Sequence, residues 1–285
     1  MASFGRYQTV REIHRSGFTV LYSGRTATSS EAKYAIKVFQ PFTLLLETEQ
    51  AKIETDLFLN SAQIQQKTSV IGAQYWAPIH QCDSIPDGAF YVTDKYDRSL
   101  QQLIDTNITL TPQTFHKIIE SIVKGLIELK KACGRPHGNL KAGNILIAGT
   151  GDMSHTKIVL SDPLPDEHID TEVHWDDDLR EVAEFIYQLV IHRPSPNVDG
   201  WQVPDSKEWT KLGKQAQEWR NLCNRLLVSH MKPGTMSLDI LIRELARIAK
   251  IKPVLSTRRL IIASVLVVIA VAAAIWLIPV IFPVL

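Results

Sequence analysis

The clearest indication of how this chain folds is PHGNLKAGNILI, residues 136–147 of 285. The stretch follows a predicted long helix over 111–134, which begins at a Thr-Pro pair, has apolar residues three and four apart, and ends in basic residues and a glycine. It precedes a short apolar strand at 158–160, which leads into Ser161, Asp162 and Pro163. One histidine and two asparagines thus stand in a loop between a helix and a strand, a usual place for functional side chains.

On either side of this loop the sequence differs in character. Before about residue 95, the ranges 6–13, 19–27, 33–39, 76–85 and 89–96 have β-branched and aromatic residues between turn signals, and 47–66 is helical in composition. Later, helices are predicted over 111–134, 177–192, 206–230 and 237–250. A small sheet lobe followed by a helical lobe is a two-lobe α+β plan.

The C-terminal residues 260–285 form a run of 26 residues without a charge. A helix that spans a bilayer needs about 20 apolar residues, and a helix on a soluble domain would show a polar face that is absent here. Basic residues gather between Lys250 and Arg259, which by the positive-inside rule puts the preceding domain in the cytoplasm. We expect a single-pass membrane protein with a basic juxtamembrane linker at 251–259 and a transmembrane helix at 260–285. The alternative is a hydrophobic helix that binds a partner.

The rest of the composition excludes other classes of protein. Without residues 251–285, the chain has 28 Lys and Arg against 30 Asp and Glu. A nucleic-acid-binding domain usually has a basic excess, so we expect no nucleic-acid partner. The cysteines Cys82, Cys133 and Cys223 are scattered without a CxxC pair, which suits a reducing compartment.

Three motifs in one order resemble the protein kinase-like superfamily. They are YAIKVF at 34–39, HGNLKAGNIL at 137–146 and IVLSDP at 158–163. The resemblance covers about residues 5–250 and implies a two-lobe α+β fold, with a β-rich N-lobe over 1–95 and a helical C-lobe over 96–250. A kinase domain, a basic linker and one transmembrane helix is also the order of parts in bacterial receptor-type serine/threonine kinases.

The resemblance implies a site for ATP and magnesium. Lys37 matches the lysine that holds the α- and β-phosphates, and Asn144 and Asp162 match the two magnesium ligands. The lysine would pair with an acidic residue of the following helix, for which Glu54 is the first choice, with Glu49 and Asp56 as competitors. Singly, a lysine on a strand is usually solvated and an aspartate before proline usually starts a turn. The joint arrangement is what favours the site.

Two departures from this pattern affect the chemistry. Asn139 stands at the position of the catalytic aspartate, and its amide cannot accept a proton; general-base catalysis typically contributes about 10²–10⁴-fold. The segment at 13–22 puts His14, Ser16 and Thr19 at the three glycine positions of a phosphate-binding loop, so side chains would crowd the phosphates. We expect ATP and magnesium to bind weakly or not at all, and no cofactor to be required.

Other departures affect regulation and substrate binding. Gly138 replaces an arginine that can pair with a phosphate on an activation loop, and Pro163 and Leu164 replace Phe-Gly after Asp162. Only 15 residues separate Asp162 from Asp178, which leaves no room for an activation segment, a peptide-positioning loop and an Ala-Pro-Glu anchor. The scaffold that would orient a protein substrate is therefore missing.

Two surfaces are candidates for protein partners. The acidic segment 162–178 is predicted to be a surface loop that docks a basic partner, and a solvated loop explains its His168 and His174 better than a metal site does. The C-lobe stretch 200–219 contains Trp201, Trp209 and Trp219, which would anchor a partner or, above all for Trp219, belong to the core.

The first functional hypothesis is a membrane-anchored pseudokinase, a non-catalytic regulatory or scaffold module on the cytoplasmic face. The second is a small-molecule phosphotransferase, because Gly138, Gly143 and Asn144 fit the pattern of aminoglycoside and choline kinase relatives, which also lack a peptide-binding activation segment. Asn139 removes the base in that pattern too. The third, with least support, is an active kinase that uses Asp162 and Asp166 unconventionally.

Overall fold

The computed structural model of the chain describes residues 2–41, 48–149, 156–168, 175–196, 198, 200–229 and 234–251. In these segments, no helix is both long and apolar enough to cross a bilayer. The predicted transmembrane helix at 260–285, and the predicted linker at 251–259 except for its first residue, lie outside them.

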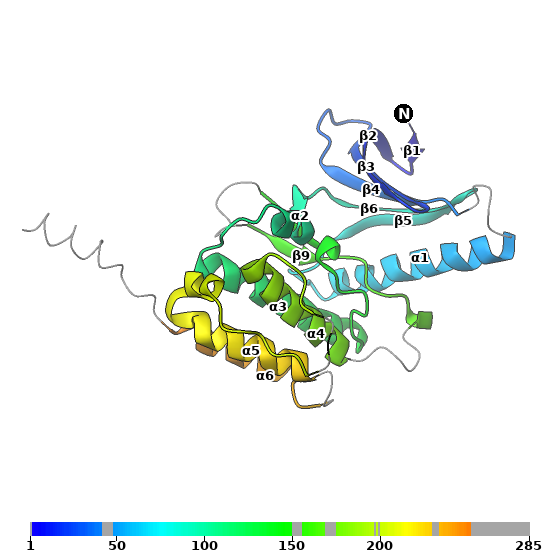
Figure 1. The fold of residues 1–285 in the computed structure, drawn as a ribbon. Helices are drawn as coiled ribbons and strands as arrows, with labels where there is room; N and C mark the ends of the chain where they lie inside the picture. The colour runs from blue at the N-terminus through cyan, green and yellow to red at the C-terminus, as the bar shows by residue number, and fades with distance from the viewer. Residues whose placement is uncertain are drawn as a thin grey trace, which may run out of the picture.

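A six-stranded antiparallel sheet with strand order β1-β2-β3-β4-β6-β5 forms the first lobe (Figure 1). The strands are β1 (Ser3–Phe4), β2 (Tyr7–Ser16), β3 (Thr19–Thr26), β4 (Tyr34–Phe39), β5 (Ile79–Ile85) and β6 (Gly88–Asp94). In β4, Ile36 and Val38 are buried in one cluster with side chains of β6. Because side chains alternate along a strand, Lys37 between them points to the opposite face, which is turned toward the second lobe.

One long helix, α1 (Thr48–Val70), packs against β5 and β6. Figure 1 shows its N-terminal end extending away from the helical lobe. Its C-terminal half buries Ala62, Ile64 and Gln65. In this half, Ser61 and Gln65 reach the segment after β9 (Ile158–Leu160).

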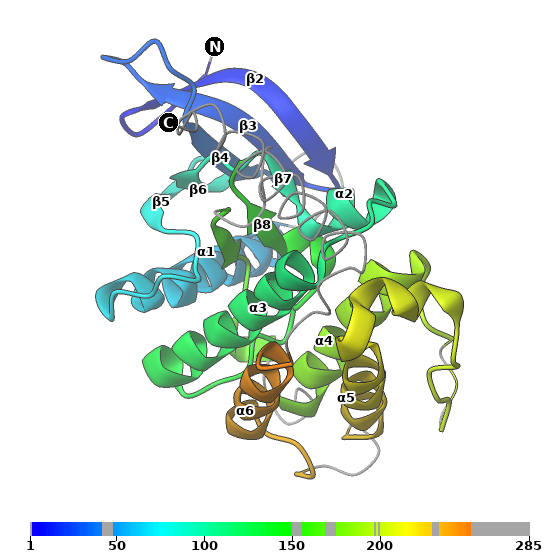
Figure 2. The same ribbon diagram turned by 90° about the vertical axis from the view of Figure 1, so that its left-hand side faces the viewer.

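The second lobe is mainly helical and lies below the sheet in the view of Figure 2. Its elements are β7 (Arg98–Ser99), α2 (Leu100–Asp105), α3 (Pro112–Cys133), η1 (Ala142–Asn144), β8 (Ile145–Ile147), β9 (Ile158–Leu160), η2 (Asp166–His168), α4 (Trp175–Ile191), η3 (Lys207–Gln215), α5 (Ala216–Ser229) and α6 (Leu238–Ala249). The Thr111 side chain caps α3 by accepting a hydrogen bond from the Thr114 amide, and Gly134 ends it with φ of 69°. The predicted limits of this helix are confirmed.

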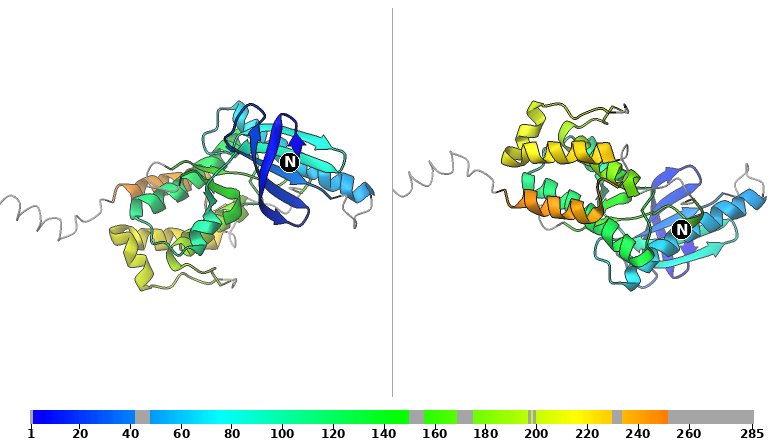
Figure 3. Two further views of the ribbon diagram at one scale, coloured as in Figure 1. Left: turned by 90° about the horizontal axis from the view of Figure 1, so that it is seen from above. Right: turned by 90° about the horizontal axis from the view of Figure 1, so that it is seen from below.

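The predicted helical stretch over 206–230 is confirmed as an α-helix only in its second part, α5. The first part is a 3₁₀ segment, η3, and Gly213 inside it interrupts the helical conformation with φ of 60° before α5 begins. Glycine adopts this left-handed conformation without the steric cost that a Cβ atom would add. In the view from below, α5 and α6 lie side by side (Figure 3).

The two lobes are joined by a short parallel bridge between Trp76 and Leu160. The Leu160 amide donates to the Tyr75 carbonyl at 2.9 Å, and the Ala77 amide donates to the Leu160 carbonyl at 2.9 Å. The Trp76 indole donates to the Gly125 carbonyl of α3 at 2.8 Å. A Cβ atom at Gly125 would lie 2.6 Å from the Leu160 side chain, so this close approach requires glycine. The bridge brings the residues after β9 next to α1.

Candidate functional site

The loop 136–147 is held by buried hydrogen bonds that centre on His137. The backbone amides of His137 and Gly138 donate to the two carboxylate oxygens of Asp178 on α4, at 2.6 and 3.0 Å. The His137 ring lies 3.1 Å from the Ser161 carbonyl through Nε2, while its Nδ1 accepts from the Asn139 amide at 3.2 Å. Nε2 therefore carries the proton of a neutral imidazole. The Trp76 ring stacks on this imidazole at 5.5 Å.

Burial favours the neutral forms of the two ionisable side chains in this cluster, His137 and Asp178. It lowers the pKa of His137 to about 4, with the Ser161 carbonyl opposing the shift. It raises the pKa of Asp178 to about 7, although the two amide donors from His137 and Gly138 act in the opposite direction. These residues form a structural brace beneath the loop.

Asn139 points its amide group into the structure. Its side-chain Nδ2 donates to the backbone carbonyl of Asp162 at 2.9 Å. The backbone carbonyl of Asn139 accepts from Asn144 Nδ2 at 2.8 Å. The Asn144 carbonyl in turn accepts from the amide and the hydroxyl of Ser161, at 2.9 and 3.1 Å. The side chain at the base position is thus a donor that ties the loop to the segment after β9. A carboxylate could not make this bond because it has no proton to donate.

Asp162 is the centre of charge in the cleft between the lobes. Its Oδ1 lies 2.5 Å from Lys37 Nζ and accepts from the Tyr91 hydroxyl at 2.6 Å, and its Oδ2 accepts from Ser161 at 3.2 Å. The Lys37 and Asp162 side chains are only 25% and 19% exposed. Burial disfavours the ionised carboxylate, but the Lys37 charge and the three donors outweigh it and lower the pKa of Asp162.

The backbone of Asp162 is also constrained. Its φ is 58°, a left-handed conformation that is uncommon outside glycine. Gln65 of α1 accepts from the Asp162 amide at 2.8 Å and donates to the Ala77 carbonyl at 2.7 Å, while Ser61 donates to the Pro163 carbonyl at 2.6 Å. These contacts, together with the Lys37 ion pair, hold the residue in place.

The expected pairing of Lys37 with Glu54 is wrong for this structure. Lys37 pairs with Asp162, and Glu54 accepts a hydrogen bond from Gln50 at 2.9 Å, while the competitors Glu49 and Asp56 are exposed. Glu54 lies in the N-terminal half of α1, whereas the contacts to Asp162 come from Ser61 and Gln65, two to three turns further along. Sequence reasoning missed these two residues because the face that α1 presents depends on packing. Only their polarity in a helical stretch could have indicated them.

Aromatic side chains fill the space beside this ion pair. Phe58 of α1 stacks on Phe39 at 5.3 Å and on Tyr91 at 5.4 Å, and Phe18 meets Phe39 edge-on at 6.3 Å. Phe18 belongs to the two-residue turn between β2 and β3, at the tip of the hairpin where the kinase resemblance implies a glycine-rich loop. A continuous row of rings therefore runs from the hairpin tip to the hydroxyl that binds Asp162.

The segment after Asp162 is clamped by Arg135, whose side chain is 8% exposed. The guanidinium forms an ion pair with Asp166 at 2.6 Å and donates to the Leu164 carbonyl. The Leu164 amide donates to the His137 carbonyl at 2.8 Å. Sequence reasoning did not identify Arg135, although an arginine next to the loop was a signal. The clamp uses an internal carboxylate where an activation loop would use a phosphate.

A nucleotide-bound magnesium ion would have to displace the present partners of the Asp162 carboxylate. Mg²⁺ needs oxygen ligands in near-octahedral geometry, but the Asp162 carboxylate is already engaged by an ammonium and two hydroxyls. Within the described residues, no three His, Cys, Asp or Glu side chains gather as metal ligands. His168 is exposed in η2, and His174 lies outside the described residues.

The two surfaces predicted to bind protein partners are the tryptophan-containing stretch 200–219 and the acidic segment 162–178. Trp209 and Trp219 are buried in the core of the helical lobe, at 2% and 0% exposure, so neither anchors a partner. Trp201 is half-buried against Tyr187, with ring centroids 5.2 Å apart. The acidic segment 162–178 is described only in part, with residues 169–174 outside.

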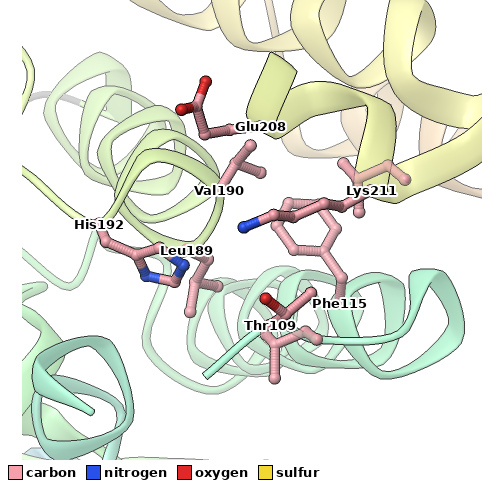
Figure 4. A pocket seen from close by; sticks show the side chains of 9 residues that line it. Thr109, Phe115, Leu189, Val190, His192, Glu208 and Lys211 are labelled. Carbon is pink, nitrogen blue, oxygen red and sulfur yellow. The ribbon is translucent and has the colours of Figure 1, made fainter. Parts of the chain in front are cut away.

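A small cavity lies between the loop before α3, the end of α4, and η3 (Figure 4). His192, Lys211 and Thr109 gather around it, but it holds only about 10 Å³, about the space of one water. None of the residues that line it belongs to the site described above.

The fold is that of a protein kinase domain. Three structures of the PknI kinase domain of Mycobacterium tuberculosis each cover 87% of this chain. A single-substitution variant of that domain is 15% identical to this chain, with a TM-score of 0.61 and 97% of that domain covered. A double-substitution variant is 16% identical, with a TM-score of 0.60 and 97% covered. The unsubstituted domain is 14% identical, with a TM-score of 0.59 and 98% covered. Comparison with protein-family models and with curated proteins gives no match. At these identities the likeness establishes the fold and leaves the chemistry to the residues themselves.

Proposed function

We propose that this chain is a membrane-anchored pseudokinase, a non-catalytic regulatory or scaffold module that works through protein contacts on the cytoplasmic face. The observation that carries this proposal is the Lys37–Asp162 ion pair at 2.5 Å. In this pair, the side chain that a kinase would use to hold the phosphates and the side chain that it would use to hold the metal bind each other. ATP would have to break this pair and displace the Tyr91 hydroxyl before it could bind.

The absence of chemistry is supported by Asn139. Phosphoryl transfer to a hydroxyl is helped by a carboxylate that accepts its proton, and this amide instead donates its own proton to the Asp162 carbonyl. The same reasoning applies to a small acceptor as to a protein acceptor, so it also disfavours a small-molecule phosphotransferase. Nucleotide binding is weak or absent and is not required for the function.

The membrane anchor is proposed from sequence alone, from the uncharged run at 260–285 and the basic residues before it. If it is correct, the full chain stays with the membrane fraction at alkaline pH, and a chain that ends at residue 259 is released. Release of both forms would contradict the anchor while leaving the non-catalytic assignment intact.

Restoring the carboxylate tests the non-catalytic assignment. We expect Asn139→Asp to transfer no phosphate from ATP to protein substrates, to aminoglycosides or to the chain itself. It should also lower the free energy of unfolding by about 1–3 kcal/mol, because a carboxylate would face the Asp162 carbonyl without a hydrogen bond. Asn107→Asp, at an exposed position, is the matched control and should change neither quantity. Phosphate transfer by the wild type or by Asn139→Asp would overturn the proposal.

A further inference from the structure

The predicted linker begins at Ile251, which lies against the last residue of η3. The Gln215 side chain is buried, and its Nε2 donates to the carbonyls of Ile248 and Ile251 at 3.1 and 3.3 Å. Figure 1 shows the yellow segment η3 and the orange end of α6 on the same side of the molecule, opposite the side to which the N-terminal end of α1 extends. The surface of η3 is therefore the surface next to the start of the linker.

The distance from this surface to the proposed membrane anchor is limited by the length of the linker. Leu260, the first residue of the uncharged run, follows Ile251 by nine residues. A fully extended chain covers at most about 3.3–3.6 Å per residue, so under the proposed anchor Ile251 lies within roughly 30 Å of the bilayer. The side of the domain that carries η3 is therefore kept close to the membrane.

The segment η3 has a buried side and a side that bears lysines. Its buried residues are Trp209, Leu212 and Gln215. Lysine recurs along the rest of the segment, and one more lysine follows the last turn of α6. These four lysines are all exposed, and we call them the basic face: Lys207, Lys211, Lys214 and Lys250.

The basic face keeps a surplus of positive charge. The one acidic residue within η3 is Glu208. Glu218 in the first turn of α5 is paired with Arg247 at 2.5 Å, and Asp205 before η3 is paired with Arg220 at 2.7 Å. Within the described part of the chain, no lysine of the basic face forms an ion pair. Its charges are therefore available to an anionic surface.

We propose that the basic face lies on the anionic surface of the membrane in which the chain is anchored. Basic side chains are attracted to an anionic leaflet, and this attraction falls off within a Debye length of about 8 Å at physiological salt. The short linker supplies the proximity, and the lysines supply the complementary charge. This orientation rests on the proposed membrane anchor, and it directs the N-terminal end of α1 away from the bilayer.

The test uses the full chain in lipid nanodiscs, either of phosphatidylcholine alone or with about 30% phosphatidylserine. An uncharged amine-reactive reagent labels the lysines, and mass spectrometry gives the labelling rate of each one. We expect Lys207, Lys211 and Lys214 to be labelled at least about threefold more slowly in the anionic discs than in the neutral discs. The exposed Lys33 of the sheet lobe and Lys131 in the last turn of α3 should be labelled at the same rate in both. Salt at about 1 M should remove the difference, because the Debye length falls to about 3 Å.

A charge reversal within the basic face tests the electrostatic cause. With Lys214→Glu, the slowing at Lys207 and Lys211 in anionic discs should fall to about half or less, because a repulsive charge then faces the lipid. Lys131→Glu is the matched control, because it makes the same charge change at an exposed position in the last turn of α3. It should leave the slowing unchanged. An equal loss with both variants would overturn the proposal.

The other outcomes also decide between the basic face and its alternatives. Equal labelling rates in the two kinds of disc would overturn the proposal, and so would slowing confined to Lys250, which the basic linker alone would explain. Slowing already present in neutral discs would indicate contacts between copies of the chain and would overturn it too. A chain that does not co-elute with either disc would contradict the membrane anchor, and the orientation with it. Co-elution with both discs and equal labelling rates would overturn the orientation alone.

Discussion

At the scale of the residue, Asp162 explains most of what the cleft can do. Its carboxylate, amide and carbonyl are each bound by the protein, through Lys37, Gln65 and Asn139. The left-handed φ of a non-glycine residue costs of order 1–3 kcal/mol, and these bonds offset that cost. Sequence reasoning identified Lys37, Asn139 and Asp162 from motif order, but it could not predict that their polar groups would satisfy one another.

The Lys37–Asp162 pair should contribute measurably to stability. Lys37→Met keeps the length of the side chain and removes its charge, so Asp162 loses its strongest partner. We expect the free energy of unfolding to fall by roughly 1.5–3 kcal/mol, the range for a hydrogen bond to a charged group. Chemical denaturation measures this quantity, with Lys33→Met, an exposed lysine just before β4, as the matched control.

The double variant Lys37→Met with Asp162→Asn separates the pair from its surroundings. Because the asparagine has no charge left unpaired, the double variant should be less destabilised than the sum of the two single variants. Additive effects would indicate that the pair is not coupled, contrary to the observed geometry.

His137 should remain neutral throughout the physiological range. Burial lowers its pKa to about 4, so its ring signals in NMR spectra should not titrate between pH 5 and 8, and Nε2 should carry the proton. A titration midpoint near 6.5 would contradict the brace beneath the loop.

The effect of this cluster on stability follows from the sign of each shift. His137 takes up a proton near pH 6.5 in the unfolded chain and only near pH 4 in the folded chain. As pH falls through that interval, His137 therefore lowers the free energy of unfolding by up to about 3 kcal/mol. Asp178 acts in the opposite direction, because its pKa is raised to about 7 in the folded chain. Its contribution to the free energy of unfolding is fully present below about pH 4 and is lost as pH rises through about 7. The two contributions to the free energy of unfolding largely cancel. The NMR titration of the His137 ring therefore tests the cluster better than the pH dependence of stability does.

At the scale of the element, α1 distinguishes this molecule from its sequence-based prediction. The helix was expected to supply a glutamate to Lys37, but it supplies an aromatic ring beside the cleft and two neutral polar residues to the segment after β9. The composition of 47–66 was sufficient to predict a helix. The face that turns inward is set by contacts with β5, β6 and the second lobe, which are distant in sequence.

The aromatic row gives α1 a role in stability that can be tested. Phe58→Ala removes a ring that stacks on both Phe39 and Tyr91 and leaves space beside Tyr91, whose hydroxyl binds Asp162. We expect the free energy of unfolding to fall by about 2–4 kcal/mol, because both packing and the ring contacts are lost. Thermal or chemical denaturation measures the change. Ile53→Ala, at an exposed position on the same helix, should have little effect, and an equally small effect of Phe58→Ala would contradict the packing role.

At the scale of the whole molecule, the two lobes and their order along the chain follow from local patterns. Alternating residues predict the sheet lobe, and the apolar spacing at 111–134 and 177–192 predicts the main helices of the second lobe. The break at Gly213 and the burial of Trp209 were not predictable in the same way, whereas Trp219 lies in the core, the place that the sequence favoured for it. A glycine inside a helical pattern is often tolerated, and a tryptophan suits an interface as well as a core.

The whole-molecule consequence is that the Lys37–Asp162 ion pair braces the two lobes together, and under the proposed function it takes the place of a nucleotide between them. Lys37 in the sheet lobe and Asp162 in the second lobe are joined directly, and the Trp76–Leu160 bridge lies beside them. ATP binding would have to exchange this internal ion pair for phosphate contacts.

Isothermal titration of the full chain with ATP and Mg²⁺ therefore tests whether the cleft is closed by its own ion pair. We predict no saturable heat up to millimolar nucleotide, and no change in melting temperature under the same conditions. Saturable, magnesium-dependent binding that Lys37→Met abolishes would contradict this, because it would show that Lys37 leaves Asp162 to hold a nucleotide.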